Sequence, residues 1–280
     1  MTERSHAEAI REAAERLSHV SETARLDAEY LMSMAAKVPR EDLWRLDMQG
    51  EPIRAEEAFE RLVARRLARE PLAYILGNQE FFGRTFRVTP GVLIPRSDSE
   101  TLIYAVQEHA PHAKRVLDMG TGSGALFVTA LLELKDASGV AIDASQDVLH
   151  VAENNAQRLG LGRKQAKFLL RDWTKGGWSD GLGQFDLVLC NPPYVADDAP
   201  LEPDVRDYEP AAALFAGPEG LDDYRVIIPQ LGKLLIPGGV AVLEIGSTQA
   251  DAVAALARDS GFDVTLRHDL AGRPRALILR

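Results

Sequence analysis

The sequence predicts an α/β fold in which a small helical domain precedes a mostly parallel sheet. Beyond Lys114, short apolar runs alternate with helix-forming stretches as far as Ile245, a pattern typical of βαβ units. The end of the chain differs, because two apolar runs flank Gly272-Arg273-Pro274. We expect these runs, 262–266 and 275–279, to form a terminal antiparallel pair.

The first 70 residues have a different composition. They are rich in Ala, Glu, Arg and Leu, and their apolar residues recur at three- and four-residue intervals, which predicts amphipathic helices. The clearest helices are 7–13 and 58–64. Alternating residues between 75 and 95, with Gly83 and Pro90, predict a hairpin. We therefore expect three parts: a helical domain at 1–74, a hairpin linker at 75–96 and a main domain at 97–280.

A glycine-rich turn joins a predicted strand to a predicted helix. Residues 114–119 lead into Gly120-Thr121-Gly122-Ser123-Gly124, and 125–132 have helix-forming composition. Glycine adopts positive φ readily and lets a ligand approach the backbone, while a helix start presents free N–H groups. A second strand, 140–143, ends in Asp143 roughly 20 residues after the first glycine. This carboxylate suits a ribose diol, so the turn is a candidate cofactor site.

Two classes of cofactor fit this turn. Gly120, Gly122 and Ala125 match the G-x-G-x-x-A pattern of dinucleotide sites, so nicotinamide or flavin binding stays open. Asp118 favours the other class, because a carboxylate just before the turn would repel a pyrophosphate. The same charge would attract the ammonium and sulfonium groups of S-adenosylmethionine. The methyl donor is the better fit.

The stretch 168–173 predicts a third strand followed by an acid and an indole. At that position Asp172 and Trp173 can meet the amino group and ring face of an adenine. Ordinary core packing accounts for Trp173 equally well. Asp143, in turn, has an alternative role as a cap of the helix that begins near Ala144-Ser145.

Asn191-Pro192-Pro193-Tyr194 follows directly on the apolar run 185–190, which predicts a buried strand that stops abruptly. The prolines keep the backbone out of a helix, so its carbonyls stay free to accept hydrogen bonds. Asn191 adds a side-chain acceptor and Tyr194 a flat aromatic face. The tetrapeptide indicates a pocket that grips a planar NH2 group, and a plain Pro-Pro turn is the alternative.

Such a grip suits the chemistry of an amide. Its nitrogen is a poor nucleophile, because the lone pair is delocalised into the carbonyl. Two oxygen acceptors that take both N–H bonds direct the lone pair at an electrophile, so positioning replaces a general base. The proton leaves after the bond has formed, because an alkylated amide nitrogen carrying positive charge is strongly acidic. We therefore expect no catalytic His or Glu.

Over most of its length the chain resembles the HemK/PrmC family of protein-(glutamine-N5) methyltransferases, which modify peptide-chain release factors. Further family-like segments occur in the expected order: Pro71-Leu72-Ala73-Tyr74-Ile75-Leu76-Gly77, Glu80-Phe81-Phe82-Gly83, Val92-Leu93-Ile94-Pro95-Arg96, Glu209-Pro210, Ala213-Leu214, Gly220-Leu221-Asp222-Asp223-Tyr224-Arg225 and Glu244-Ile245-Gly246. The resemblance implies a Rossmann-like S-adenosylmethionine-dependent methyltransferase sheet. It also implies methyl transfer to the glutamine side-chain amide of the release-factor Gly-Gly-Gln motif.

The resemblance also implies roles for individual residues. Asn191 and the carbonyl of Pro192 would hold the glutamine amide, with Pro193 and Tyr194 lining its pocket and Asn191, Pro192 and Tyr194 serving catalysis. The methyl donor would contact Gly120, Thr121, Gly122, Ser123, Gly124, Asp143, Trp173 and Asn191. The helical domain at 1–74 would dock the release factor, while a helical cap on the main domain is the alternative and both roles are compatible.

One segment departs from the family pattern. After Pro95-Arg96 the family usually continues Pro-Glu-Thr-Glu, whereas this chain has Ser97-Asp98-Ser99-Glu100. Ser97 and Glu100 match a capping box, which predicts that the next helix starts there. The missing proline puts the rigidity of that wall of the site in doubt.

Composition narrows the classes of protein. The chain has 280 residues, 46% of them hydrophobic, which is enough for a full core. We expect no membrane span, since every apolar stretch falls short of about 18 residues, and no metal site, since the histidines are scattered. Without a leader, and with Cys190 as the single cysteine, a cytoplasmic setting and a buried thiol are expected. The net charge of −10 argues against direct DNA binding.

Three other functions stay open. A glutamine in a ribosomal protein would need the same active site. A nucleic-acid adenine-N6 methyltransferase would also grip a planar NH2 group, on a flipped-out base. The third alternative is a binding module that holds the methyl donor but catalyses no transfer. The sequence does not indicate an oligomeric state.

Overall fold

The computed structural model describes residues 4–49, 53 and 55–280. These residues form two compact units. The first contains the chain up to Asn78 together with Leu201–Tyr208, and the second contains Gln79–Pro200 and Glu209–Arg280. The chain therefore passes between the units three times, and a short segment far along the sequence belongs to the N-terminal unit. None of the helices in the described part of the chain is long and apolar enough to cross a membrane.

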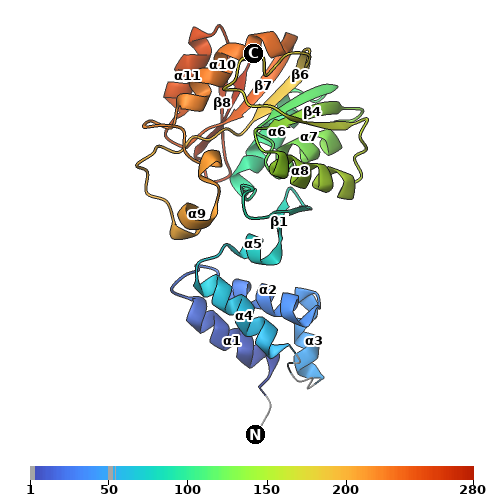
Figure 1. The fold of residues 1–280 in the computed structure, drawn as a ribbon, viewed down its shortest axis with the longest axis vertical. Helices are drawn as coiled ribbons and strands as arrows, with labels where there is room; N and C mark the ends of the chain where they lie inside the picture. Colours follow the sequence, from blue (N-terminus) through green and yellow to red (C-terminus); the bar gives the residue numbers. More distant parts are fainter. Residues whose placement is uncertain (1–3, 50–52, 54) are drawn as a thin grey trace. The chain divides into compact units, whose positions relative to one another are not determined.

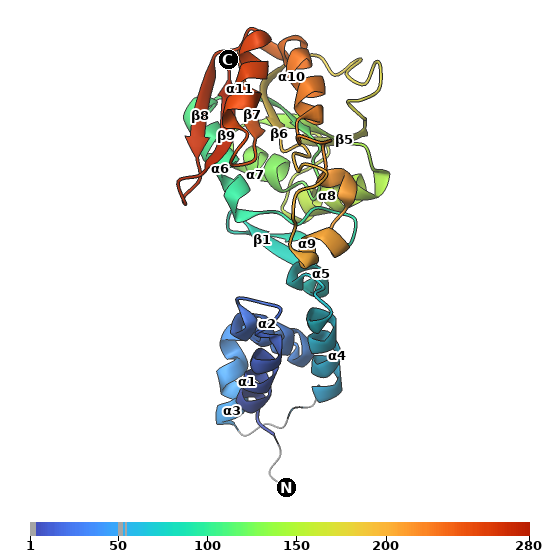
Figure 2. The ribbon, with the colours of Figure 1, turned by 90° about the vertical axis from the view of Figure 1, so that its left-hand side faces the viewer.

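The first unit is helical (Figure 2). Its elements are α1 (His6–Leu17), α2 (Ala24–Ala36), the 3-10 turn η1 (Arg40–Asp42), α3 (Leu43–Met48), α4 (Glu56–Leu67), α5 (Leu72–Leu76) and α9 (Pro203–Tyr208). The predicted helices at 7–13 and 58–64 are confirmed within α1 and α4. A capping box between Ser5 and Glu8 starts α1. The apolar stripes of the longer helices share one core, which includes Ile10, Leu17, Leu31, Met32, Phe59 and Val63.

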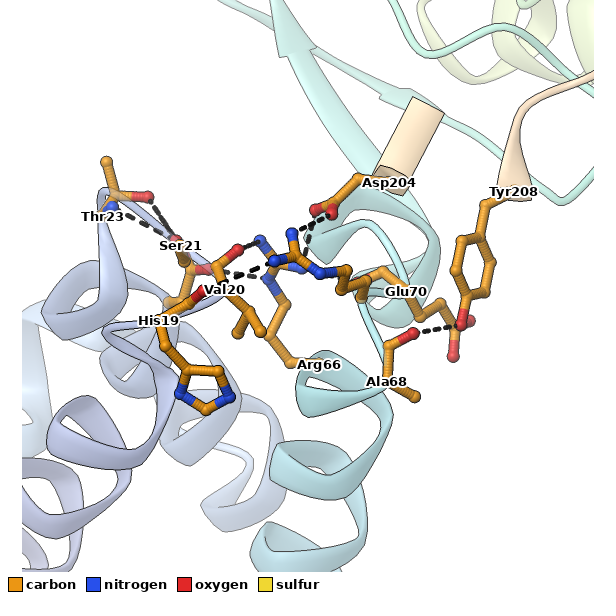
Figure 3. Close-up of polar contacts among 11 residues, drawn as sticks. His19, Val20, Ser21, Thr23, Arg66, Ala68, Glu70, Asp204 and Tyr208 are labelled. Carbon is orange, nitrogen blue, oxygen red and sulfur yellow. Dashed lines mark hydrogen bonds and ion pairs between the residues drawn. The ribbon is translucent and has the colours of Figure 1, made fainter. Parts of the chain in front are cut away.

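A buried arginine holds the distant segment in this unit (Figure 3). Arg66 of α4 donates from Nε to Asp27 Oδ2 at 2.9 Å and from Nη1 to Asp204 Oδ2 of α9 at 2.8 Å. Its Nη2 donates to the carbonyl of Val20. The Tyr208 hydroxyl adds a 2.6 Å bond to the carbonyl of Ala68. One guanidinium thus joins α2, α4 and α9.

The second unit is built on a seven-stranded sheet with the order β5-β4-β3-β6-β7-β9-β8. The strands are β3 (Arg115–Met119), β4 (Ser138–Asp143), β5 (Ala166–Leu170), β6 (Phe185–Cys190), β7 (Leu235–Glu244), β8 (Val264–His268) and β9 (Pro274–Leu279). Strands β3 to β7 pair in parallel, and β9 is antiparallel to both β7 and β8. The predicted parallel sheet and terminal antiparallel pair are confirmed. The hairpin predicted between 75 and 95 is the two-stranded sheet of β1 (Asn78–Phe81) and β2 (Arg84–Arg87).

Helices cover both faces of the large sheet (Figure 1). One apolar core lies between the sheet and α6 (Glu100–His109), α7 (Ala125–Glu133) and part of α8 (Gln146–Arg158). The other lies under α10 (Asp222–Leu234) and α11 (Ala250–Asp259). In β4, β7 and β9 successive apolar residues alternate between the two cores, since side chains of a strand point to opposite faces. Cys190 is fully buried in the second core, as expected for a structural thiol.

The chain order of the strands reverses between β3 and β6. From β3 the chain proceeds to β4 and β5 on one side, then returns to place β6 and β7 on the other. Open α/β sheets bind ligands at the carboxyl ends of the strands at such a reversal. The two loops expected to hold ligands follow the two strands that meet there.

The predicted capping box at Ser97 and Glu100 is wrong. Residues Ser97–Ser99 form the 3-10 turn η2, and α6 begins at Glu100 with no side-chain cap at either start. Glu100 instead accepts the backbone N–H of Phe82 at 2.8 Å through Oε1. Glu100 thus bonds the distant Phe82 and not the nearby Ser97, although the helix still begins at the expected place.

Candidate functional site

The glycine turn and the tetrapeptide meet because β3 and β6 are neighbours. Met119 pairs with Cys190 at the ends of these strands, so Gly120 and Asn191 start adjacent loops. A Cβ atom added to Gly120 would lie 3.9 Å from the Asn191 carbonyl oxygen and 3.0 Å from Trp173 Cη2. Gly120 has φ +73°, a conformation that glycine adopts without strain. The turn, the tetrapeptide and the indole therefore converge at one point.

A cavity of about 500 Å³ opens at this point. Of the residues singled out in the sequence, it is lined by Gly120, Thr121, Gly122, Ser123, Asp143, Trp173, Asn191 and Pro193. Gly124, Pro192 and Tyr194 are not among its lining residues. Gly124 caps α7 with φ +82°, and a Cβ there would press on Ala152 of α8 at 3.2 Å. A glycine is therefore needed at position 124 so that α7 and α8 can pack together.

Other lining residues were not assigned a role from the sequence. They include residues of family-like segments, and residues of the loops, turns and helix starts that follow the strands: Ile94, Pro95, Arg96, Ala144, Ser145, Val148, Pro210, Ala212, Ala213 and Asp223. Most are small or apolar, so their composition carries no chemical signal. Their position after strand ends, or within a family-like segment, was the available clue.

Asp143 is held by main-chain N–H groups. Oδ2 accepts from Gly122 at 3.1 Å and Oδ1 from Ser145 at 3.0 Å. Burial raises the pKa of this carboxyl, and these backbone hydrogen bonds oppose the rise. Ser145, and not Asp143, is the N-cap of α8. A carboxylate can accept further hydrogen bonds beyond these two, so Asp143 remains able to receive a diol.

Trp173 both packs and lines the cavity. Its ring contacts the core under α10 and α11, and its Nε1 donates to Asp223 Oδ1 at 2.6 Å. Asp172 also lines the cavity, with Oδ1 accepting from the backbone N–H and hydroxyl of Thr174. The indole of Trp173 thus packs in the core and also lines the cavity, so the two alternatives considered for it are compatible. Its orientation is fixed by a carboxylate that the sequence analysis had not assigned.

Asp118 lies behind the glycine turn instead of lining the cavity. Its side chain is 1% exposed, and neither carboxyl oxygen has a hydrogen-bond partner among the described residues. Burial raises its pKa to about 7, the neighbouring Thr121 hydroxyl opposes this rise, and the charge of Asp143 adds to it. An unpaired buried carboxyl is costly, and a nearby cation relieves that cost. These features, with the diol acceptor at Asp143 and the indole, fit S-adenosylmethionine.

The backbone around the tetrapeptide is anchored from both sides. Tyr194 and Val195 donate their N–H groups to the Leu214 carbonyl at 3.1 and 2.8 Å, and the Tyr194 carbonyl accepts from Gln249 Nε2 at 2.9 Å. Within the described chain the Asn191 side chain makes no hydrogen bond, and nothing donates to the Pro192 carbonyl. Both oxygen acceptors are thus unused within the described chain, and Asn191 is the one of the two residues that lines the cavity.

The wall formed by Ile94, Pro95 and Arg96 is held by a buried carboxylate. Glu209 Oε2 accepts the Ile94 N–H at 3.1 Å, and Oε1 bonds the Arg96 guanidinium. This clamp acts on the segment just before Ser97, where the family proline is missing. It rigidifies the wall from a distant part of the chain.

Comparisons with known proteins agree with this architecture. The family model described as PrmC N-terminal domain matches residues 8–77, and the model described as methyltransferase domain matches residues 111–262. The chain is 43% identical over 248 residues to a protein of Geobacter sulfurreducens named release factor glutamine methyltransferase, covering 86% of this chain and 84% of that one. A protein of the same name from Cereibacter sphaeroides is 41% identical and covers 98% of both chains.

Solved structures share the sheet architecture at low identity. A methyltransferase from Pyrococcus furiosus superposes with a TM-score of 0.53 at 18% identity, covering 77% of this chain and 95% of that chain. SMU.776, a putative methyltransferase complexed with SAH, gives a TM-score of 0.52 at 11% identity, covering 72% and 56%. These likenesses establish a methyltransferase fold.

Proposed function

This chain belongs to the release factor glutamine methyltransferase family, and we propose that it methylates the glutamine side-chain amide of the Gly-Gly-Gln motif in a peptide-chain release factor. The observation that carries this proposal is the pair of available oxygen acceptors at Asn191 and Pro192. They stand at the end of β6, beside the glycine turn that follows β3. The chemistry of this pair fits an NH2 group.

In this mechanism the chain acts by holding and orienting. S-adenosylmethionine, when bound, supplies an electrophilic methyl group. Asn191 Oδ1 and the Pro192 carbonyl accept the two amide N–H bonds, which aims the nitrogen lone pair at the methyl carbon. With the donor held in line, the methyl group would pass from sulfur to this nitrogen, and the excess proton would then leave the alkylated nitrogen to water. No side chain has to remove a proton beforehand.

The donor site follows the same logic. Asp143 would receive the ribose diol, Trp173 would pack against the adenine, and the turn residues 120–123 would line the cavity that holds the donor. Asp118 lies behind them, and the positive charges of a bound donor would favour its negative form. Gly124 supports this site through packing.

The parts of the chain have distinct proposed tasks. Residues 1–74 dock the release factor, residues 75–96 link this domain to the next, and residues 97–280 carry the methyl transfer. The matched PrmC N-terminal domain at residues 8–77 supports this division. We place the reaction in the cytoplasm, where release factors act on ribosomes.

A direct assay tests the proposal. The protein is incubated with labelled donor and, separately, with purified release factor, ribosomal proteins or DNA, and the modified residue is located by mass spectrometry. The proposal predicts one methyl group on the glutamine of the Gly-Gly-Gln motif. Labelling of DNA or of a ribosomal protein in its place would overturn it.

A further inference from the structure

A second cavity adjoins the acceptor end of the site. It measures about 470 Å³ and is lined by polar side chains, among them Tyr194, Glu244 and Arg275. Ile94, Pro95 and Arg96 line both cavities. The tetrapeptide divides between them, because Asn191 and Pro193 line the first cavity and Tyr194 lines the second. A chain segment in the second cavity would therefore pass next to the amide grip.

Glu244, at the end of β7, contributes a buried carboxyl group to this cavity. Its side chain is 1% exposed. Oε1 accepts from the Tyr194 hydroxyl at 3.3 Å, whereas Oε2 is buried without any hydrogen-bond partner among the described residues. Burial raises the pKa of this carboxyl to about 7, and the neighbouring Ser99 hydroxyl, Arg275 and the Tyr194 hydroxyl oppose the rise. A buried acceptor left unpaired costs free energy, so a donor that enters the cavity gains an unused partner.

The charges of the cavity favour a neutral ligand that carries both a donor and an acceptor. Arg275 pairs with Asp98 at 3.0 Å, and Arg96 pairs with Glu209. These guanidinium groups would repel a cationic ligand but retain N–H groups for a carbonyl. Glu244 Oε2 needs an N–H. A peptide unit presents one N–H and one C=O and has no charge.

We propose that this second cavity binds the main chain of the acceptor protein immediately beside the target glutamine, with Glu244 accepting one main-chain N–H. Tyr194 then joins the two subsites, since its backbone continues from Asn191 and its hydroxyl is bound to Glu244. The inference rests on the proposed function and adds a recognition site for the peptide backbone. Specificity for a glycine-flanked glutamine follows, because small neighbours let the main chain approach the cavity wall.

The first test uses Glu244→Gln, which keeps the shape of the side chain but replaces one acceptor oxygen with a donor. We expect the KM for release factor to rise about tenfold or more, as for a lost hydrogen bond to a charged group. The dissociation constant for S-adenosylhomocysteine, measured by calorimetry, should stay within about twofold. Glu219→Gln is the matched control, because Glu219 is exposed and pairs with Arg225. An unchanged KM in Glu244→Gln would overturn the inference.

A second test changes the ligand and leaves the enzyme intact. Release factors assembled by ligation carry a main-chain ester in place of one amide, at either glycine or at the residue after the glutamine. One ester should lower kcat/KM about tenfold with wild-type enzyme and have little further effect with Glu244→Gln. The inference would be contradicted if the ester and Glu244→Gln lowered kcat/KM independently, so that their effects multiplied in full. It would also be contradicted if none of the three esters changed kcat/KM. If wild-type enzyme leaves unaltered release factor unmodified, the proposed function itself fails.

Discussion

Asp143 shows how the main chain can fix the orientation of a single carboxylate. Two backbone N–H groups orient its carboxylate toward the cavity, and no basic side chain competes for it among the contacts of the described residues. This residue was predictable from its distance to the first glycine. The hydrogen bond by which Gly122 of the turn holds the carboxylate was not predictable from spacing.

Asp143→Ala should weaken donor binding. A hydrogen bond to a charged group contributes about 1.5–3 kcal/mol, or roughly tenfold to over a hundredfold in affinity. Calorimetric titration with S-adenosylhomocysteine measures this change. Asp147→Ala is the control, because Asp147 is exposed one turn away on α8. Equal affinities for the two variants would show that Asp143 does not contact the donor.

Asp118 makes folding stability depend on pH. Its pKa is about 7 in the folded protein against an ordinary value of 3.8, so the folded state favours the protonated form. The resulting stabilisation is complete below pH 3.8 and is lost as pH rises through about 7. Asp118→Asn mimics the protonated carboxyl and should escape this loss.

Hydrogen exchange of the β3 amides at several pH values measures the effect. The stability of Asp118→Asn relative to wild type should increase between about pH 5 and pH 8. The pKa of Glu244 also lies near 7. The slope of folding stability against pH should therefore become shallower in Asp118→Asn but should not vanish. Parallel curves for the two proteins would exclude an altered pKa at Asp118.

Among the elements, the pairing of β3 with β6 determines the site. The two strands are separated by more than sixty residues of sequence, and only the sheet order brings their ends together. The strands and their parallel direction were predictable from apolar runs. Their order was expected only through the family resemblance, because periodicity does not specify which strands are neighbours.

Gly120→Ala should damage the donor site through a contact between loops. The new Cβ would meet the Trp173 ring at 3.0 and 3.2 Å, which is too close for packing to remain unchanged. We expect donor affinity to fall about tenfold or more. Gly160→Ala is the control, since Gly160 also has positive φ but open space around it. Both substitutions cost about 1–2 kcal/mol of backbone strain. Equal donor affinities in the two variants would therefore show that the contact with Trp173 does not affect the donor site.

Local rules failed where distant partners intervened. Glu100 bonds Phe82 in place of Ser97, Glu209 clamps Ile94 and Arg96, and Asp223 orients Trp173. These carboxylates were visible in the sequence, several within family-like segments. Their partners lie too far along the chain for spacing rules to identify.

At the scale of the whole molecule, the division into units does not follow the order of the chain. The segment Leu201–Tyr208 belongs to the N-terminal unit although it lies within the sequence of the second. Its attachment depends on Arg66, whose side chain is 7% exposed. No periodicity at 201–208 indicates this position, since the helix is short and polar.

Arg66→Met should therefore destabilise the N-terminal unit. It leaves the buried Asp27 carboxylate without its cation, and breaking a buried pair costs about 3–5 kcal/mol. Arg65→Met should cost about 0–1 kcal/mol, because Arg65 is 44% exposed and pairs with Glu70. Hydrogen exchange of α2, α4 and α9 measures both. Similar losses in the two variants would show that Arg66 does not hold the segment.

Asn191 and Pro192 are proposed to activate the amide nitrogen by positioning it. The most direct measurement is the turnover of Asn191→Ala on purified release factor, with donor affinity measured alongside. Loss of the Asn191 acceptor should lower kcat about a hundredfold or more and change donor affinity much less, whereas the exposed control Asn154→Ala should turn over normally. Glutamine methylation by Asn191→Ala at the wild-type rate would contradict the account.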